Sequence, residues 1–401
     1  MSNKISRRNF LKSFTVAAAA TGVACQRLTS KVSGSGLVQA LEERVFLPFL
    51  SSESNPSPTA TPTPTATPTQ PPLPTQPPNP YGPIIADHTV VNKYQNIPQQ
   101  YIDKIKKMWI DIPGESHSKA YRTGCELLEA QDSRFQVNVT EIGTPEGYTD
   151  QHLRISCATW GDVNKSSNWI YDYGEEDWYT SPQAIQRTKD HITHCNTNNL
   201  QIAAMGFGWC YDMEWWNGPG GGVDPVYQVR WAGSSIGGPD GNLRWGLDDG
   251  DYNLTGNRIC MNSYLDATLQ YLAHCQANSL PTRIFFTTGP VDGDSNDAES
   301  GYQRYLKHEY IRDFVSANNH VLFDYADILC WSDSGEQSTL TWTDFGGTLS
   351  TFPFIHDDNM LTLDGIYSTS VGHIGERGAL RLGKALWWFL ARMAGWDGGS
   401  I

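Results

Sequence analysis

The chain has few basic residues for its length and no cysteine pattern that would indicate a metal site. Lys and Arg number 29 against 43 Asp and Glu, which gives a formal net charge of −14. Because phosphate contacts need clustered Lys and Arg, and the sequence has no such cluster, we expect no nucleic-acid partner. The cysteines form no CxxC pair and no zinc-like spacing, and those after Cys25 lie at wide intervals. One or two disulfides stay open, with no pairing predicted.

The sequence also lacks an apolar run long enough to span a membrane. The stretch Phe14 to Cys25 falls short of the roughly 20 residues that a transmembrane helix needs. It follows Arg7 and Arg8 in SRRNFLK, a pattern typical of a twin-arginine signal. We therefore expect residues 1–30 to be a signal peptide that exports the folded chain to an extracellular or cell-surface location. Cys25 is a candidate lipidation site and membrane tether, with ordinary cleavage nearby as the alternative.

A Pro/Thr-rich tract separates this signal from the rest of the chain. Residues 31–83 include PSPTATPTPTATPTQPPLPTQPPNP, which has too little apolar surface to form a core and is stiffened by proline. We expect this segment to be a disordered linker, either a stalk or a simple spacer. Residues 84–401 are then long enough for one large domain.

The domain alternates apolar runs with amphipathic stretches, which predicts a three-layer α/β/α sandwich around a mostly parallel sheet. The Gly- and Trp-rich segment at about 212–257 breaks the alternation and is either a lid over a substrate or a passive insertion. The many aromatic residues suit a sugar-binding cleft, but for most of them a place in the core is the better expectation. The predicted strands are 108–112, 135–139, 153–158, 200–207, 283–288 and 320–325, and the predicted helices are 181–196, 260–278, 301–318 and 377–395.

In parallel sheets of this kind, ligands bind beyond the carboxyl ends of the strands. The first predicted strand ends in PGESHS, where Gly114 permits a tight turn and Ser116 precedes a helix. A serine there is either a helix cap or a nucleophile next to the positive end of the helix dipole. Later strand ends carry Gly161 and the stretch GFGWCYD, and His373 stands just before the last predicted helix.

These segments, in this order, resemble the SGNH hydrolases, the GDSL-type esterase and lipase superfamily. The resemblance implies a flavodoxin-like fold and a serine esterase without metal or cofactor, with Ser116 as nucleophile and His373 as base. Backbone N–H groups of Ser116 and Gly161 would hold the oxyanion. GFGWCYD lacks the family's asparagine, so an N–H near Gly208 or Trp209 would have to replace it.

The triad acid departs from the family pattern as well. The acid usually lies three residues before the histidine, where this chain has Ser370. Asp364, in DGIY, is the first candidate to orient His373, and Asp357 and Asp358 are alternatives. Ser118 is the alternative nucleophile.

Two weaker patterns suggest metals. His191 and His194 lie one helical turn apart beside Cys195, and residues 292–297 have a calcium-like acidic spacing without its glycine and terminal glutamate. Neither has enough ligands, so we predict no metal.

The sequence therefore predicts an exported serine esterase that acts on a small-molecule or glycan ester, with an acylated polysaccharide favoured by the stalk and the tryptophans. The alternative is a catalytically silent carbohydrate-binding or surface-display domain on the same fold.

Overall fold

The structure, a computed structural model, describes residues 83–114, 116–161, 168–171, 177–211, 213–214, 218–233, 243–291 and 298–399. All of them belong to one compact unit, which begins at Gln70. The linker, the signal segment and Cys25 lie outside the described residues.

The centre of the unit is a parallel sheet. Five strands pair in the order β3-β4-β2-β7-β8, and three more in the order β1-β10-β9, and all of these pairs are parallel. Only Phe285 separates β8 from β9, and its N–H donates to Met205 O at 3.0 Å, so the two groups join through one segment of chain. The strands are β1 (Ile85–Ala86), β2 (Trp109–Asp111), β3 (Val137–Thr140), β4 (Leu153–Ser156), β7 (Ile202–Met205), β8 (Arg283–Ile284), β9 (Phe286–Thr287) and β10 (Leu322–Phe323).

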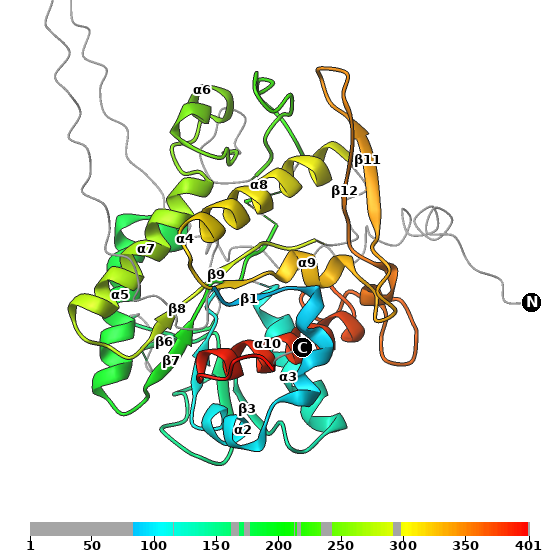
Figure 1. Cartoon of the computed structure of the whole chain (residues 1–401). Helices are drawn as coiled ribbons and strands as arrows, with labels where there is room; N and C mark the ends of the chain where they lie inside the picture. The colour runs from blue at the N-terminus through cyan, green and yellow to red at the C-terminus, as the bar shows by residue number, and fades with distance from the viewer. Residues whose placement is uncertain are drawn as a thin grey trace, which may run out of the picture. The chain divides into compact units, whose positions relative to one another are not determined.

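Helices cover both faces of the sheet and enclose two separate cores, which makes the three-layer α/β/α sandwich (Figure 1). Strand β2 shows why, because successive side chains point to opposite faces: Trp109 belongs to one core and Ile110 to the other. One layer holds η2 (His88–Asn96), α2 (Gln99–Ile105), α3 (Ser118–Gln131), α9 (Tyr325–Cys330) and α10 (Glu376–Met393). The other holds α4 (Asp177–Thr180), α5 (Pro182–Thr197), α7 (Met261–Ala277) and α8 (Ala298–Ala317).

The predicted fold class is confirmed, and each predicted strand and long helix has a counterpart within a few residues. The sequence did not predict β1, the helices η2 and α2 that follow it, or two antiparallel hairpins. The hairpins are β5 (Thr159–Trp160) with β6 (Trp169–Ile170), and β11 (Thr339–Thr343) with β12 (Leu349–Pro353). The remaining short helices are η3 (Asp249–Asp251), α6 (Tyr252–Thr255) and η4 (Asp357–Met360).

The insertion at about 212–257 is anchored to the domain in its described part. Trp231 and Trp245 are fully buried in the core between the sheet and α7. Lys307 of α8 donates hydrogen bonds to Met213 O at 2.8 Å and to Ala232 O at 2.9 Å. Most of the described tryptophans are buried in the same way, as expected for core residues.

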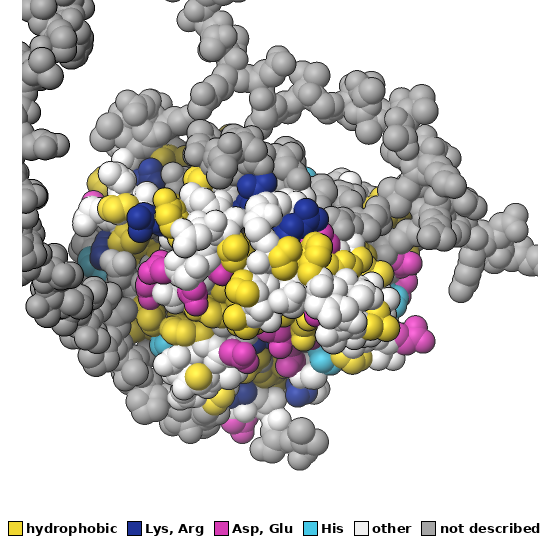
Figure 2. All heavy atoms as spheres, turned by 90° about the horizontal axis from the view of Figure 1, so that it is seen from above, with side chains coloured by type: hydrophobic (Ala, Val, Ile, Leu, Met, Phe, Trp, Pro, Cys, Tyr) yellow, Lys and Arg dark blue, Asp and Glu magenta, His cyan; other side chains and the backbone are white. Residues whose placement is uncertain are grey.

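The seven described cysteines are all free and buried, so no disulfide joins them. None of the described helices is both long and apolar enough to cross a bilayer. On the face drawn in Figure 2, basic and acidic side chains are interspersed among apolar and uncharged ones.

Helices α3 and α10 are in backbone contact. A Cβ on Gly383 would lie 2.3 Å from Gly124 O, and one on Gly124 would lie 2.0 Å from Ala379 O, so neither position has room for a side chain. The two glycines thus set the spacing of two helices that begin close to Ser116 and His373.

We expect Gly383→Ala to lower the free energy of unfolding by about 1–3 kcal/mol, because overpacking outweighs the better helix propensity of alanine. Equilibrium urea denaturation measures the change. Gly147→Ala is the control, since Gly147 is exposed and its Cβ would meet nothing within 4 Å. Equal stability of the two variants would contradict the close helix contact.

Candidate active site

Ser116 lies between the end of β2 and the start of α3. The chain leaves the sheet at Asp111, passes through Pro113 and Gly114, and enters α3 at Ser118. The first N–H groups of a helix have no partner within it, and the helix dipole makes this end positive. Ser116 is half-buried, with its hydroxyl directed at a residue from the other end of the chain.

That residue is His373, whose Nε2 lies 2.8 Å from Ser116 Oγ. His373 stands in a two-residue turn between Val371 and Ile374, and both turn residues have positive φ, 55° at Gly372 and 65° at His373. A non-glycine residue in this region is uncommon and clusters at functional sites. A Cβ on Gly372 would lie 2.3 Å from Ser116 O, so glycine lets the turn pack directly on the serine backbone.

Two aromatic rings flank the His373 imidazole. His117 lies 5.1 Å away between ring centroids and Tyr211 lies 4.6 Å away, and these two rings also meet edge to face at 5.0 Å. Burial, with smaller effects of His373 and Arg304, lowers the pKa of His117 well below its ordinary value. His117 therefore stays neutral near neutral pH and packs against His373.

Cys210 completes the immediate surroundings of the serine. Its Sγ lies 3.0 Å from Ser116 Oγ, on the loop that follows β7. The loop is held there by a hydrogen bond of 2.8 Å from Gly208 N–H to Pro113 O, which joins the ends of two neighbouring parallel strands. The sequence analysis did not single out Cys210. The available signal was its place at a strand end, in the stretch already compared with the family's third block.

The nominated oxyanion donors divide into two groups. Gly161 N–H donates to Asn168 O at 2.9 Å within the β5–β6 hairpin, and Gly208 N–H donates to Pro113 O, so neither is available in this conformation. The N–H groups of Ser116 and Trp209 have no acceptor among the described residues. Within the described part of the chain, Ser116 and Trp209 are thus the nominated positions whose N–H groups are not engaged.

The structure does not bring Asp364 to His373. Asp364 lies in an exposed turn that begins at Thr362, and no hydrogen bond or ion pair joins it to the imidazole. The alternatives Asp357 and Asp358 begin the short helix η4, where Asp358 N–H donates to His356 Nδ1. Asp358 makes no hydrogen bond or ion pair to His373 among the described residues. Closeness in sequence therefore did not predict a contact between Asp364 and the imidazole.

Ser118 is the first residue of α3 and is buried. It is 1% exposed, its hydroxyl donates to Ile112 O, and Arg122 Nη1 donates to Ser118 Oγ at 2.8 Å. Arg122 also pairs with Glu141 through two bonds of 2.9 and 3.2 Å. The hydroxyl proton of Ser118 is thus engaged in linking α3 to the end of β2, whereas Ser116 faces the histidine.

Ser116 and His373 open onto a cavity of about 700 Å³. Its lining includes the Arg122–Glu141 pair, Lys119 and the hydroxyl-bearing Thr369 and Ser370, together with Cys157 and Tyr171. No described tryptophan and no described residue of the 212–257 insertion lines this cavity. The described part of the insertion therefore gives no support to the expectation of a lid over this site.

The histidine pair considered for a metal is engaged in other contacts. His191 Nε2 lies 2.9 Å from Asp111 Oδ2 and its Nδ1 accepts from Trp160 N–H, so both ring nitrogens have partners. Burial raises the pKa of Asp111, although the bond from His191 opposes this effect. His194 stacks on Trp160 with centroids 3.8 Å apart. The calcium-like segment 292–297 lies outside the described residues.

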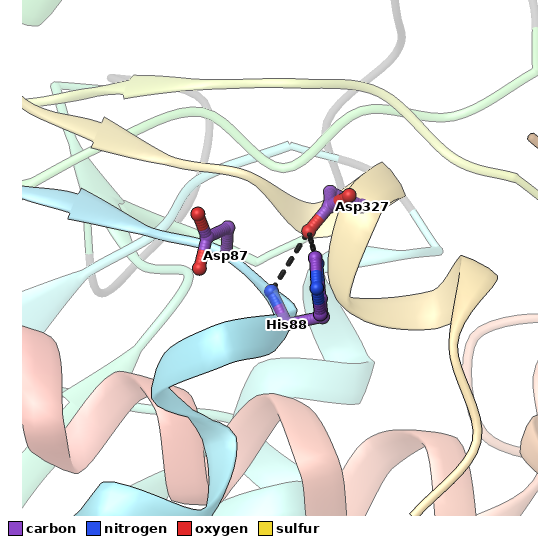
Figure 3. A group of neighbouring side chains, drawn as sticks. All are labelled: Asp87, His88 and Asp327. Atoms are coloured by element: carbon purple, nitrogen blue, oxygen red, sulfur yellow. Dashed lines mark hydrogen bonds and ion pairs between the residues drawn. The ribbon is translucent and has the colours of Figure 1, made fainter. Parts of the chain in front are cut away.

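A different group, Asp87, His88 and Asp327, places possible metal ligands near one another at the ends of β1 and β10 (Figure 3). Asp327 Oδ2 accepts from His88 N–H at 2.8 Å and meets its Nδ1 at 2.5 Å, while Asp87 Oδ1 caps η2 through Thr89. These bonds account for the group as a link between η2 and α9, and we assign no metal to it.

The comparisons with known proteins add one firm result. Residues 4–24 match the model of the twin-arginine translocation pathway signal sequence. The chain carries a twin-arginine export signal. This confirms the predicted route of export to the extracellular or cell-surface space.

The other comparisons carry no functional argument. No curated protein matches the sequence. Among solved structures, the chain is similar to a "putative acylhydrolase" from Bacteroides fragilis, with 9% identity over 70% of this chain and 87% of the other. The TM-score is 0.28, which is too low to support an inference about this protein.

We expect Ser118→Ala to lower the free energy of unfolding by about 1–3 kcal/mol, since it leaves Arg122 Nη1 and Ile112 O without their partner. Urea denaturation measures the loss. Ser316→Ala on α8 is the matched control, because Ser316 is exposed and its hydroxyl has no described partner. A Ser118→Ala variant as stable as this control would show that the Ser118 hydroxyl has no structural role.

Proposed function

We propose that the exported domain is a serine esterase, with Ser116 as nucleophile and His373 as general base. The observation that carries the proposal is the 2.8 Å distance between Ser116 Oγ and His373 Nε2 at the mouth of a cavity. A base within hydrogen-bond reach of a hydroxyl is the arrangement that makes serine nucleophilic. The left-handed backbone of His373 gives further support, because such a conformation is costly unless the fold requires it.

In the proposed reaction, His373 Nε2 takes the proton of Ser116 as Oγ attacks the ester carbonyl. The N–H of Ser116, at the positive end of α3, is placed to stabilise the oxyanion. His373 then returns its proton to the departing alcohol, and water hydrolyses the acyl-enzyme by the same route. Packing between His117 and Tyr211 orients the imidazole throughout.

We propose a glycan ester as the substrate class, because charged and hydroxyl-bearing side chains line one part of the cavity. Lys119, the Arg122–Glu141 pair and the hydroxyl groups of Thr369 and Ser370 offer hydrogen bonds to a polyhydroxylated alcohol. A long acyl chain would need a more apolar lining. This argument replaces the one from tryptophan content, since the described tryptophans are mostly in the cores.

Ester hydrolysis by the purified chain tests the proposal directly. We expect p-nitrophenyl acetate and acetylated glycans to be hydrolysed, and both Ser116→Ala and His373→Ala to reduce kcat/KM by at least about a thousandfold. The double variant should be no worse than either single one, since the two residues act as a unit. Ser118→Ala should retain activity. Loss in Ser118→Ala but not in Ser116→Ala would move the nucleophile, and no activity on any ester would favour a carbohydrate-binding domain.

The position of Asp364 leads to a separate expectation. Because Asp364 is exposed and unconnected to His373, Asp364→Asn should leave kcat/KM within about threefold of the unmodified chain. The same chromogenic assay measures it, with His373→Ala as the inactive reference. A loss of several orders of magnitude would show that Asp364 joins the site in a conformation other than the one described.

A further inference from the structure

The hydrogen bonds of Ser116 Oγ define a role for Cys210. Among the described residues, the serine oxygen has two hydrogen-bond partners, His373 Nε2 at 2.8 Å and Cys210 Sγ at 3.0 Å. A hydroxyl has one proton and accepts through its lone pairs, while a neutral thiol has one proton of its own. If the serine proton points to His373, as base catalysis requires, the hydrogen bond to sulfur must be donated by the thiol.

On this geometry, and resting on the proposed function, we propose that the Cys210 S–H is a catalytic hydrogen-bond donor to the oxygen atoms that become negative during acyl transfer. The thiol lies within hydrogen-bond distance of the reacting Oγ atom, whereas the rings of His117 and Tyr211 pack against the base. Cys210 is 8% exposed, so water does not compete freely for its proton.

Two of the four nominated backbone donors are engaged elsewhere, which gives a side-chain donor a role beside the N–H groups of Ser116 and Trp209. Of the nominated backbone donors, the N–H of Gly161 donates to Asn168 O and the N–H of Gly208 donates to Pro113 O. The bond from Gly208 to Pro113 is also what brings Cys210 to Ser116, because it fixes the loop two residues before the thiol. The same contact thus removes one backbone donor and supplies a thiol.

The step balances without any further reactant. As the Ser116 proton moves to His373 Nε2, Oγ forms a bond to the acyl carbon and the carbonyl π electrons become the oxyanion. The S–H bond of Cys210 stays intact, and its hydrogen bond passes from Oγ to the oxyanion formed next to it. When the carbonyl reforms, the bond to the alcohol breaks and the alcohol takes the proton from His373.

The test compares Cys210→Ala, which removes the donor, with Cys210→Ser, which keeps one. We expect Cys210→Ala to lower kcat for p-nitrophenyl acetate by about tenfold with KM within about twofold, less than the loss of a full oxyanion-hole amide because a thiol is a weak donor. Cys210→Ser should restore kcat to within about threefold of the unmodified chain or exceed it. Phenylboronic acid, which forms a tetrahedral adduct with serine, should bind Cys210→Ala more weakly by about the same factor as kcat falls.

Cys275→Ala is the matched control for the loss of a buried thiol. Cys275 lies on α7, remote from the site, is 4% exposed, and burial raises its pKa to about 12, so it is inert. The control should keep kcat and the affinity for the boronic acid unchanged. Thermal unfolding of all three variants shows whether each is folded.

The outcomes separate this inference from the proposed function. If Ser116→Ala abolishes activity while Cys210→Ala matches the unmodified chain, the esterase stands and the thiol donor is excluded. If Cys210→Ser falls as far as Cys210→Ala, the sulfur acts by packing and the inference is likewise overturned. Should Cys210→Ala fail to fold, Cys210→Ser decides: retained kcat supports the donor, and a tenfold loss contradicts it. Activity that survives in Ser116→Ala would refute the proposed function itself.

Discussion

The site depends on backbone segments that approach one another more closely than side chains allow. At Gly372, the turn that carries His373 packs on the carbonyl of Ser116, and at Gly383 helix α10 packs on the backbone of α3. These contacts join the two ends of the domain, because Ser116 precedes α3 and His373 precedes α10. The distance between hydroxyl and imidazole is therefore set by main-chain packing. Main chain is stiffer than a pair of flexible side chains, so the site is organised before a substrate arrives.

The same arrangement accounts for how the imidazole keeps its orientation without Asp364. His373 has a backbone conformation that is costly in isolation, and a costly conformation persists only where the surrounding structure determines it. The turn bonds between Val371 and Ile374 and the flanking rings of His117 and Tyr211 provide that constraint. Because burial lowers the pKa of His117, its ring stays neutral and does not repel a positive charge on His373 as a charged neighbour would.

The fold and part of the candidate site could be predicted from the sequence, because the features that mark them are local in sequence. Apolar runs mark buried parallel strands, and a glycine turn before a helix marks Ser116, so both can be read within a few residues. The pairing of Ser116 with His373 was predicted from the order in which several motifs follow the strand ends. In the structure the two side chains are in contact. Asp364 was nominated because DGIY resembles a family motif, and a resemblance of four residues does not determine whether an exposed turn contacts the imidazole. Gly161 was nominated for its backbone N–H, and a hairpin too short to show any periodicity engages that group. The sequence does not indicate that the Cys210 thiol meets Ser116, because this contact depends on the hydrogen bond from Gly208 N–H to Pro113 O.

The state of the cysteines connects the site with the route of export. A twin-arginine signal implies that the domain folds before it crosses the membrane, in a compartment where thiols stay reduced. The seven described cysteines agree with this, because each is buried and free. A chain that passed unfolded into an oxidising compartment would expose these thiols to pairing with one another, Cys210 included. Folding first protects them, since burial denies access to oxidants and raises the pKa of thiols such as Cys275, which disfavours the reactive thiolate. The proposed role of the Cys210 thiol requires it to stay reduced outside the cell, and burial before export protects it from oxidation. Cys210 is buried in the folded domain.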